Sequence, residues 1–130
     1  MKFEETSDKE ETVANGIVDA AYMVHKNLGP ELLEKVYETC FCHELAKRNL
    51  SYQRQVTIPI HYDGLVFDEG LRLDVLVEDL IICEIKAVDQ VNPVWEAQLL
   101  SYLRLTKKRL GFLISFNVPI FKRGIKRLII

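Results

Sequence analysis

The sequence predicts one α/β (α+β) domain, in which a single mixed β-sheet is flanked by helices. Three observations lead to this fold class. Apolar residues recur at helical spacing through the first third of the chain and at alternating positions through the middle. A strand, a helix and another strand then follow, and such a crossover adds a parallel strand to an antiparallel meander. The length of 130 residues and the 48% of apolar residues suit one core rather than several domains.

Two helices are expected before the strands begin. Residues 1–12 are polar and acidic and are expected to fray, so the single domain is expected to comprise residues 13–130. Its first helix carries an apolar stripe that continues to Leu28. Pro30 is expected to open the second helix, which ends near Arg48. The stripe of this second helix consists of Leu33, Val36, Tyr37, Cys40, Phe41 and Leu45.

Three strands are expected next. Residues 53–62 alternate apolar and polar side chains as far as the turn signal Asp63-Gly64, and Pro59 within this run suits an edge strand. Residues 71–77 and 81–87 alternate in the same way on either side of a short polar break. These two runs are expected to form a hairpin.

A third helix and two more elements complete the predicted order. Asn92 and Pro93 suit the N-cap and first turn of a helix that continues to about Thr106. Residues 110–116 are mostly apolar and indicate a buried central strand. Residues 120–130 are expected to add a short turn and a final strand. The predicted order is therefore helix, helix, three strands, helix, strand and a short final element.

Composition and motifs exclude several classes of protein. No apolar run approaches the roughly 20 residues that cross a bilayer, so no membrane partner is expected. The acidic start after Met1 contains no readable signal peptide. Three cysteines, of which Cys40 and Cys42 are two positions apart, do not suit a disulfide framework. A cytoplasmic protein is expected.

The charged residues are distributed unevenly along the chain. Residues 1–46 contain ten acids and four bases, residues 47–100 nine and five, and residues 101–130 none and eight, although the net charge is only −2. The basic segment is interpreted either as a surface for nucleic-acid phosphates or as a solubilising surface, and composition leaves both open. The candidates for phosphate binding, called here the C-terminal basic set, are Lys107, Lys108, Arg109, Lys122, Arg123, Lys126 and Arg127.

The predicted hairpin brings charged residues together. A turn centred on residue 79 gives one continuous apolar face, formed by the pairs Val77–Ile81, Val75–Cys83, Leu73–Ile85 and Leu71–Ala87. On the opposite face Asp74 then meets Glu84, and Arg72 meets Lys86. Facing carboxylates repel each other, so a compensating charge is needed. Two interpretations stay open: a salt-bridged square on a solvated face, or a divalent cation, Mg²⁺ or Mn²⁺, between the carboxylates.

Three more polar residues are candidates for the same site. Glu34 lies beside the apolar stripe of the second helix and is either a third carboxylate of the site or an ordinary exposed glutamate. Gln98 and Tyr102 are four residues apart, so they share one face of the third helix and could reach a common ligand. The alternative is that Tyr102 packs in the core while Gln98 is exposed.

Together these motifs resemble the PD-(D/E)XK nuclease-like superfamily, over residues 13–130. Asp74 is similar to its acidic motif, Glu84-Ile85-Lys86 to its ExK motif, and the segment 98–102 to the QxxxY motif of one branch. The ExK triplet alone is weak evidence, whereas the ordered set is specific for the fold.

A closer resemblance is to the GxxExxY protein family within that superfamily. The segment 24–38, with Glu34 and Tyr37, is similar to the helical signature of that family. Two positions depart from the family: Glu31 stands where a glycine is expected, and Trp95 stands where a histidine is expected.

The resemblance implies a restriction-endonuclease-like fold and a metal-dependent phosphodiesterase site. Asp74 and Glu84 would bind Mg²⁺ or Mn²⁺, and Glu34 would complete or orient the metal shell. Lys86 would lie beside the attacking water and stabilise developing charge. These roles follow from the resemblance and not from the spacing of the residues.

The resemblance also implies contacts with nucleic acid. Gln98 and Tyr102 would brace the site or touch the substrate, while Arg72 and the C-terminal basic set would bind its backbone. The leading hypothesis is a metal-dependent nuclease or nuclease-like enzyme that acts on DNA, and RNA is an alternative substrate. The rival hypothesis is a noncatalytic nucleic-acid-binding or protein-assembly module. The small size favours a homo-oligomer or a partner protein in either case.

Overall fold

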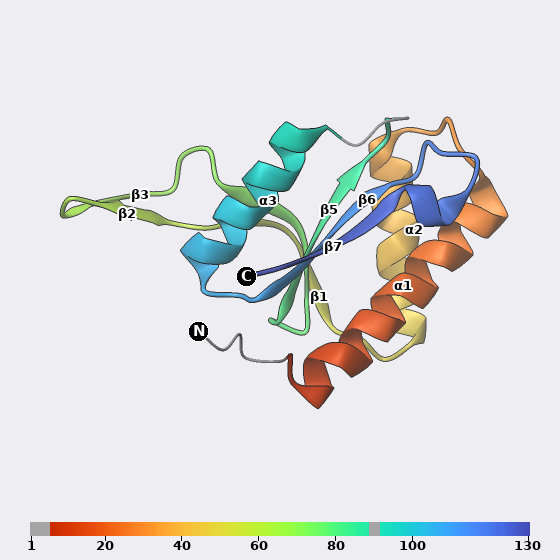
Figure 1. Cartoon of the computed structure of the whole chain (residues 1–130), viewed down its shortest axis with the longest axis horizontal. Coiled ribbons are helices and arrows are strands. Elements are labelled where there is room, and N and C mark those ends of the chain that lie inside the picture. Colours follow the sequence, from red (N-terminus) through yellow and green to blue (C-terminus); the bar gives the residue numbers. More distant parts are fainter. Residues whose placement is uncertain (1–5, 89–91) are drawn as a thin grey trace.

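A computed structural model describes residues 6–88 and 92–130 of the chain, in three helices, seven strands and one short 3-10 helix (Figure 1). The helices are α1 (Asp8–Leu28), α2 (Glu34–Lys47), α3 (Pro93–Thr106) and the 3-10 helix η1 (Phe121–Arg123). The strands are β1 (Tyr52–Thr57), β2 (Ile60–Tyr62), β3 (Leu65–Phe67), β4 (Arg72–Val77), β5 (Ile81–Lys86), β6 (Leu110–Ser115) and β7 (Ile125–Ile129).

Five strands form one mixed sheet, in the order β1-β4-β5-β6-β7. β5 and β6 are parallel because α3 carries the chain from one to the other, and the remaining neighbours are antiparallel. Helices α1 and α2 cover one face of this sheet and α3 covers the other (Figure 1). The predicted α/β fold with a single mixed sheet and flanking helices is confirmed, and it is consistent with a restriction-endonuclease-like fold.

Each face of the sheet has its own apolar core. The larger core joins α1 and α2 to the sheet through Ile17, Phe41 and Val75, all fully buried. The smaller core joins α3 to the sheet through Leu99 and Leu103. Because β6 carries apolar residues toward both helical layers, all six of its residues are buried, as predicted for a central strand.

Gly111 of β6 allows α3 to lie close to the sheet. A Cβ atom at this position would stand 3.1 Å from Leu99 Cδ1 of α3 and 3.2 Å from the carbonyl oxygen of Ile82 in β5. A larger residue would therefore push α3 outward or disturb the β5–β6 ladder. This close approach brings the next turn of α3, which carries Tyr102, over the polar end of β5.

The first helix begins earlier than predicted. The expectation that residues 1–12 fray is wrong for positions 8–12, because α1 begins at Asp8; residues 1–5 lie outside the described part of the chain. Ser7 and Glu10 form a capping box, in which the Ser7 side chain accepts from the Glu10 amide and the Glu10 carboxylate accepts from the Ser7 amide. The predicted end of the helix at Leu28 is confirmed.

The second helix begins at Glu34 rather than at Pro30. Glu31 has a φ of +75°, which no α-helical residue adopts, so the chain turns before the helix can begin. The hydroxyl of Tyr37 holds this turn, since it accepts from the Leu32 amide at 3.0 Å and donates to the Gly29 carbonyl at 2.7 Å. The predicted stripe is wrong at its first two positions because Leu33 and Val36 are exposed, whereas Tyr37, Phe41 and Leu45 are buried.

The predicted strand 53–62 is two strands in different sheets. β1 ends at Thr57, since Pro59 has no amide to donate to a ladder, and β2 then pairs with β3 in a separate hairpin. Asp63 and Gly64 connect β2 to β3 and both have positive φ, as a tight two-residue hairpin loop requires. β1 is an edge strand, as Pro59 predicted. The remaining elements agree with the predicted order, including the third helix from Pro93 to Thr106 and the final strand.

Two expectations from composition are also addressed by the fold. Within residues 6–88 and 92–130, no helix is both long enough and apolar enough to cross a bilayer. Cys40, Cys42 and Cys83 are all free thiols, and the last two are buried.

Candidate active site

The β4–β5 hairpin has the predicted register near its turn but opens at its other end. Val75 pairs with Cys83, and the next two pairs toward the turn also match the prediction. One residue further from the turn, side chains replace the main-chain partners: the Asp74 amide donates to Glu84 Oε2, and the Ile85 amide donates to Asp74 Oδ2, both at 2.8 Å. The two carboxylates therefore lie in a gap between two strands that remain in the same sheet.

The opening of the hairpin changes which face the residues of β4 occupy. The expectation that Leu71 and Leu73 share a face with Val75 and Val77 is wrong. Val75 and Val77 pack in the core beneath α1 and α2, whereas Leu71 and Leu73 pack in the core beneath α3. Strict alternation along a strand would keep all four on one face, so the alternation shifts by one residue at Asp74.

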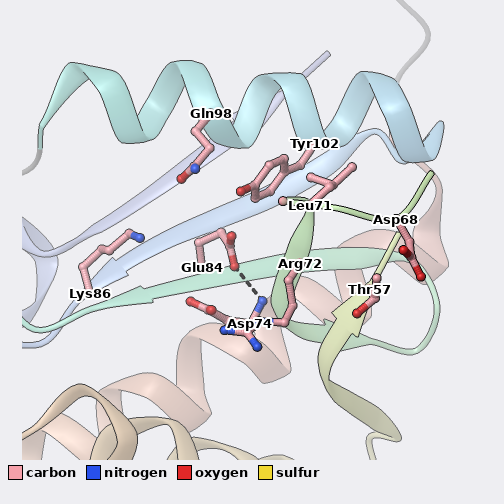
Figure 2. Close-up of a pocket in the computed structure, with 10 residues that line it drawn as sticks. Thr57, Asp68, Leu71, Arg72, Asp74, Glu84, Lys86, Gln98 and Tyr102 are labelled. Carbon is pink, nitrogen blue, oxygen red and sulfur yellow. Dashed lines mark hydrogen bonds between the residues drawn. The ribbon is translucent and has the colours of Figure 1, made fainter. Parts of the chain in front are cut away.

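Asp74 and Glu84 line a pocket of about 420 Å³ on the α3 side of the sheet (Figure 2). This pocket contains six of the residues that the sequence predicted for a site. Gln98 and Tyr102 reach it from α3, and Lys86 reaches it from the end of β5 (Figure 2). The full lining consists of Thr57, Asp68, Gly70, Leu71, Arg72, Asp74, Glu84, Lys86, Gln98 and Tyr102.

Glu84 is the most perturbed acid in this pocket. Its side chain is buried in the sheet, with 4% of the residue exposed. Burial and, second, the charge of the neighbouring Asp74 carboxylate together raise the pKa of Glu84 to about 8. In the absence of a cation, a neutral Glu84 is therefore favoured through most of the physiological pH range.

The basic residues of the pocket do not neutralise these carboxylates. In the described part of the chain, no ion pair joins Arg72 or Lys86 to Asp74 or Glu84. The ammonium of Lys86 instead lies 5.5 Å from the centre of the Trp95 ring, in a cation–π contact. The interpretation of the four charged residues as a salt-bridged square is therefore wrong.

Gln98 and Tyr102 cover the carboxylates from α3. Figure 2 shows both side chains directed from the helix toward Glu84 and Lys86. Burial raises the pKa of the Tyr102 phenol, and the charges of Glu84 and Asp74 add to this effect. Tyr102 is buried and Gln98 is exposed, so Tyr102 belongs to both the core and the pocket. The two sequence interpretations of this residue are therefore compatible.

Glu34 lies near the same carboxylates but outside this pocket. It belongs to a neighbouring pocket of about 410 Å³ between α2 and β1. Partial burial raises the pKa of Glu34, and the charge of Asp74 is the second cause. Across residues 6–88 and 92–130, no three acidic, histidine or cysteine side chains are close enough together to hold a metal ion. Glu34 does not form a three-carboxylate cluster with Asp74 and Glu84.

The donor set of the pocket nevertheless suits a hard divalent cation. Asp74 and Glu84 each use one carboxylate oxygen for a main-chain amide, and the second oxygen of each is left for another ligand. Mg²⁺ commonly binds one or two carboxylates and keeps several waters, and the pocket has room for these waters. A divalent cation would also compensate the two charges that Arg72 and Lys86 leave unpaired.

The C-terminal basic set does not form one surface at the pocket. Lys126 and Arg127 are consecutive in β7, yet Lys126 pairs with an acid of α3 and Arg127 with an acid of α1, on opposite faces of the sheet. No member of the set lines the pocket, whereas Arg72 does. Ion pairs that members of the set form with other described residues include Lys126–Glu96, Arg127–Glu11 and Lys108–Asp79.

Several residues near the site had no place in the sequence predictions. Asp68 and Thr57 line the pocket from the loop after β3 and the end of β1. No local pattern marks them, since the hairpin that brings Asp68 there was predicted as part of a strand and a turn. Glu38 is buried beside the second pocket, and its position one residue after Tyr37 on a helix was the available signal.

Comparison with known proteins assigns the chain to a family. A family model described as the PD-(D/E)XK nuclease superfamily matches residues 11–128. Comparison with curated proteins and with solved structures gives no match. The matched range includes all the elements that carry pocket residues.

Proposed function

The chain belongs to the PD-(D/E)XK nuclease superfamily, and from this premise we propose that it is a metal-dependent nuclease that hydrolyses phosphodiester bonds in DNA. Membership suggests metal-dependent, nuclease-like activity on a nucleic acid. The choice of DNA and of Mg²⁺ or Mn²⁺ is part of the proposal, as is the branch of the superfamily.

One observation carries the proposal: a buried glutamate and a half-buried aspartate lie side by side, and within residues 6–88 and 92–130 neither forms an ion pair with a cation. Asp74 and Glu84 are held by main-chain amides, and Glu84 is kept near neutrality by burial with a pKa of about 8. Such an arrangement is costly for stability alone, because neither a salt bridge nor full solvation offsets it. Perturbed carboxyls in a polar pocket favour a functional site.

The side chains suit the roles proposed for them. Asp74 and Glu84 would hold the cation, which supplies charge neutralisation at the phosphate and acidifies a water molecule. Lys86 would leave its contact with Trp95 and donate to a phosphate oxygen where negative charge develops. Glu34, from the edge of the adjacent pocket, would orient the metal shell from outside the Asp74–Glu84 pair.

The residues on α3 would act on the nucleic acid itself. Tyr102 and Gln98 would fix the side chain of Glu84 from above or donate to the substrate backbone (Figure 2). Arg72 is exposed at the rim and would bind a flanking phosphate. Three members of the C-terminal basic set already pair with acids, so we expect them to contribute less to binding than Arg72.

We also propose that the chain belongs to the GxxExxY branch. Tyr37 supports this assignment because it ties together the turn that precedes α2, from Gly29 to Leu32. Glu31 supports it as well, because its φ of +75° is one that glycine adopts without strain and glycine is expected there. The proposal includes the expected cytoplasmic location, which the free thiols of all three cysteines support.

The proposal is tested by incubating the purified chain with single-stranded DNA, double-stranded DNA and RNA in Mg²⁺ or Mn²⁺. We expect cleavage of DNA that disappears on chelation of the metal. Asp74→Asn, Glu84→Gln and Lys86→Met should each reduce the cleavage rate by roughly 10²–10³-fold, the effect of removing one group that stabilises transition-state charge.

Asp79→Asn is the matched control for these variants. Asp79 lies on the same hairpin, but its side chain is 85% exposed and is paired with Lys108 away from the pocket. This variant should cleave DNA within about 2-fold of the wild-type rate. Cleavage that resists chelation, or that is equally fast in Asp74→Asn and the control, would contradict the proposal.

A second candidate function is a noncatalytic nucleic-acid-binding or protein-assembly module, and one observation favours assembly. The β2–β3 hairpin projects beyond the body of the molecule (Figure 1) and exposes Tyr62, Leu65 and Val66 at 71%, 59% and 58%. Exposed apolar groups of this kind occur at contacts between proteins. Under this candidate, no substrate is cleaved, and light scattering shows an oligomer that Leu65→Lys dissociates.

A further inference from the structure

A buried glutamate joins α2 to the edge strand that lies behind Asp74. Glu38 is 5% exposed and accepts from Arg54 Nε at 2.9 Å and from Gln55 Nε2 at 2.7 Å. Arg54 also donates to the Thr39 hydroxyl at 3.1 Å. Two consecutive residues of β1 are thus tied by their side chains to one turn of α2.

Gln55 has a main-chain conformation that side chains other than glycine adopt reluctantly. Its φ is +53°, in the middle of a strand. The β1–β4 ladder pairs Arg54 with Val75 and Val56 with Leu73, and it passes over Gln55 and Asp74 between these pairs. The irregular residue of β1 therefore lies directly beside the irregular residue of β4.

Both strands change face at this point. Arg54 reaches Glu38 on the α2 side of the sheet, as its partner Val75 does by packing beneath α1 and α2. Val56 packs in the opposite core beneath α3, as its partner Leu73 does. The two strands keep one register on both sides of this point. The change of face in β1 at Gln55 therefore coincides with the change of face in β4 at Asp74.

We propose that Gln55 and Glu38 are positioning residues that hold Asp74 in the gap between β4 and β5, where the hairpin opens. The inference rests on the proposed function in that Asp74 is taken as a metal ligand. Glu38 stabilises the positive φ of Gln55. This conformation lets β1 remain paired with β4 where β4 changes face at Asp74. Asp74 is then free to direct its amide to Glu84 and its carboxylate to the Ile85 amide, as the hydrogen bonds require.

Substitutions at position 55 separate the backbone conformation from the side chain. Gln55→Gly keeps the positive φ accessible while it removes the bond to Glu38. Gln55→Asn also tolerates this conformation. Gln55→Val disfavours it strongly, because a β-branched side chain is a severe outlier at positive φ. Gln53→Val is a matched control, because Gln53 is exposed in the same strand, two residues away, and does not line the pocket.

The first readout is the affinity for Mn²⁺ alone, measured by electron paramagnetic resonance of the free ion. We expect Gln55→Val to weaken Mn²⁺ binding by roughly 10–100-fold, the usual effect of changing a residue that orients a ligand. Gln55→Gly, Gln55→Asn and Gln53→Val should remain within about 3-fold of wild type. If wild type binds Mn²⁺, equal affinity in Gln55→Val would overturn the proposal.

The second readout needs no metal and no activity. Hydrogen exchange of the Asp74 and Ile85 amides should become about 10-fold faster in Gln55→Val, while the amides of the paired residues Val75 and Cys83 should be unchanged. Uniformly faster exchange at all four amides would overturn the proposal, since it would indicate general destabilisation. If Gln55→Val does not fold, Glu38→Gln is the substitute and the same selective pattern is expected.

These readouts also distinguish this inference from the proposed function. If wild type binds no Mn²⁺ and cleaves no nucleic acid, the proposed function fails, yet the selective exchange at Asp74 and Ile85 still supports the positioning of Asp74. If wild type binds Mn²⁺ and Gln55→Val does so equally well with unchanged exchange, the inference fails while the proposed function stands.

Discussion

Two buried glutamates on opposite sides of the same sheet differ in the charges and hydrogen-bond donors that surround them. Glu38 is 5% exposed and Glu84 is 4% exposed, so burial alone does not distinguish them. Glu38 accepts side-chain hydrogen bonds from Arg54 Nε and Gln55 Nε2, and it forms an ion pair with the Arg54 guanidinium. Glu84 accepts one bond from a main-chain amide and lies beside a second carboxylate, with a pKa raised to about 8.

The difference separates a structural acid from one that is arranged for a ligand. A buried carboxylate is retained at low cost when a cation and hydrogen bonds surround it, as at Glu38. At Glu84 the nearest ammonium, that of Lys86, is held by Trp95 instead. The carboxylates that lack a cationic partner lie in the gap where β4 and β5 open. This gap is also the site that we propose for the cation.

The largest expected effect is a pH dependence of stability in which Glu84, beside the Asp74 carboxylate, is the main contributor. Its pKa is about 8 in the folded chain and near 4.5 in the unfolded chain, so the folded state favours the protonated form. Metal-free protein should therefore lose stability as pH rises from about 4.5 through about 8, by on the order of 4 kcal/mol. Urea denaturation between pH 5 and 9 measures this loss.

Glu84→Gln should remove most of that pH dependence, because a glutamine side chain keeps an acceptor for the Asp74 amide and does not ionise. Saturating Mn²⁺ should restore stability to wild type at pH 8 but not to the variant. A variant whose stability falls with pH as steeply as that of wild type would show that another group is responsible.

The next effect comes from leaving Glu38 without its cation. Arg54→Ala should destabilise the protein by about 3 kcal/mol at pH 7, because it leaves a buried charge uncompensated. Arg127→Ala is the matched control, since its partner Glu11 is 42% exposed; it should cost less than about 1 kcal/mol. Equal losses in the two variants, measured by urea denaturation, would contradict the comparison.

A smaller effect tests why Lys86 leaves Glu84 uncompensated. Trp95→Leu removes the ring that holds the Lys86 ammonium, so the freed side chain is expected to pair with Glu84 at high pH. The loss of stability between pH 5 and 9 should then shrink by about 1 kcal/mol, the value of a partly exposed ion pair. An unchanged pH profile would mean that Trp95 does not restrain Lys86.

The smallest effect concerns Glu31, an exposed glutamate whose cost lies in its backbone. Glu31→Gly should stabilise the protein by about 0.5 kcal/mol, because glycine tolerates the φ of +75° but loses more conformational freedom on folding. The gain should be the same at pH 6 and pH 8, unlike the effects at Glu84. Glu31→Ala, which keeps a Cβ atom, should give no such gain in the same thermal unfolding assay.

The sequence predicted the elements wherever a strong local pattern was present. The third helix followed from its N-cap and proline, and the central strand from its continuous apolar run. The predictions failed where a neighbouring segment decides the outcome. Residues 53–62 alternate throughout, yet the first half joins the main sheet and the second half joins a separate hairpin, because Pro59 interrupts the ladder.

Most residues of the candidate site could be predicted from the sequence, but their arrangement in space could not. The register of the hairpin followed from its apolar pattern, and this pattern brought Asp74 and Glu84 together. The opening of the strands at Asp74 did not follow, because it depends on hydrogen bonds from side chains to main-chain amides that alternation does not encode. Glu38 and Gln55 were absent from the predictions for the same reason.

The sequence by itself determined the α/β fold class, the antiparallel pairing near the turn of the hairpin and the residues that meet at its charged end. These properties depend on hydrophobic periodicity and on short-range turn chemistry, which are local. Only the tertiary structure decided that the basic residues of β7 diverge to two faces, that Lys86 binds Trp95, and that Glu84 remains uncompensated. These outcomes depend on which side chains meet after three layers pack together, and charges interact through space rather than along the chain.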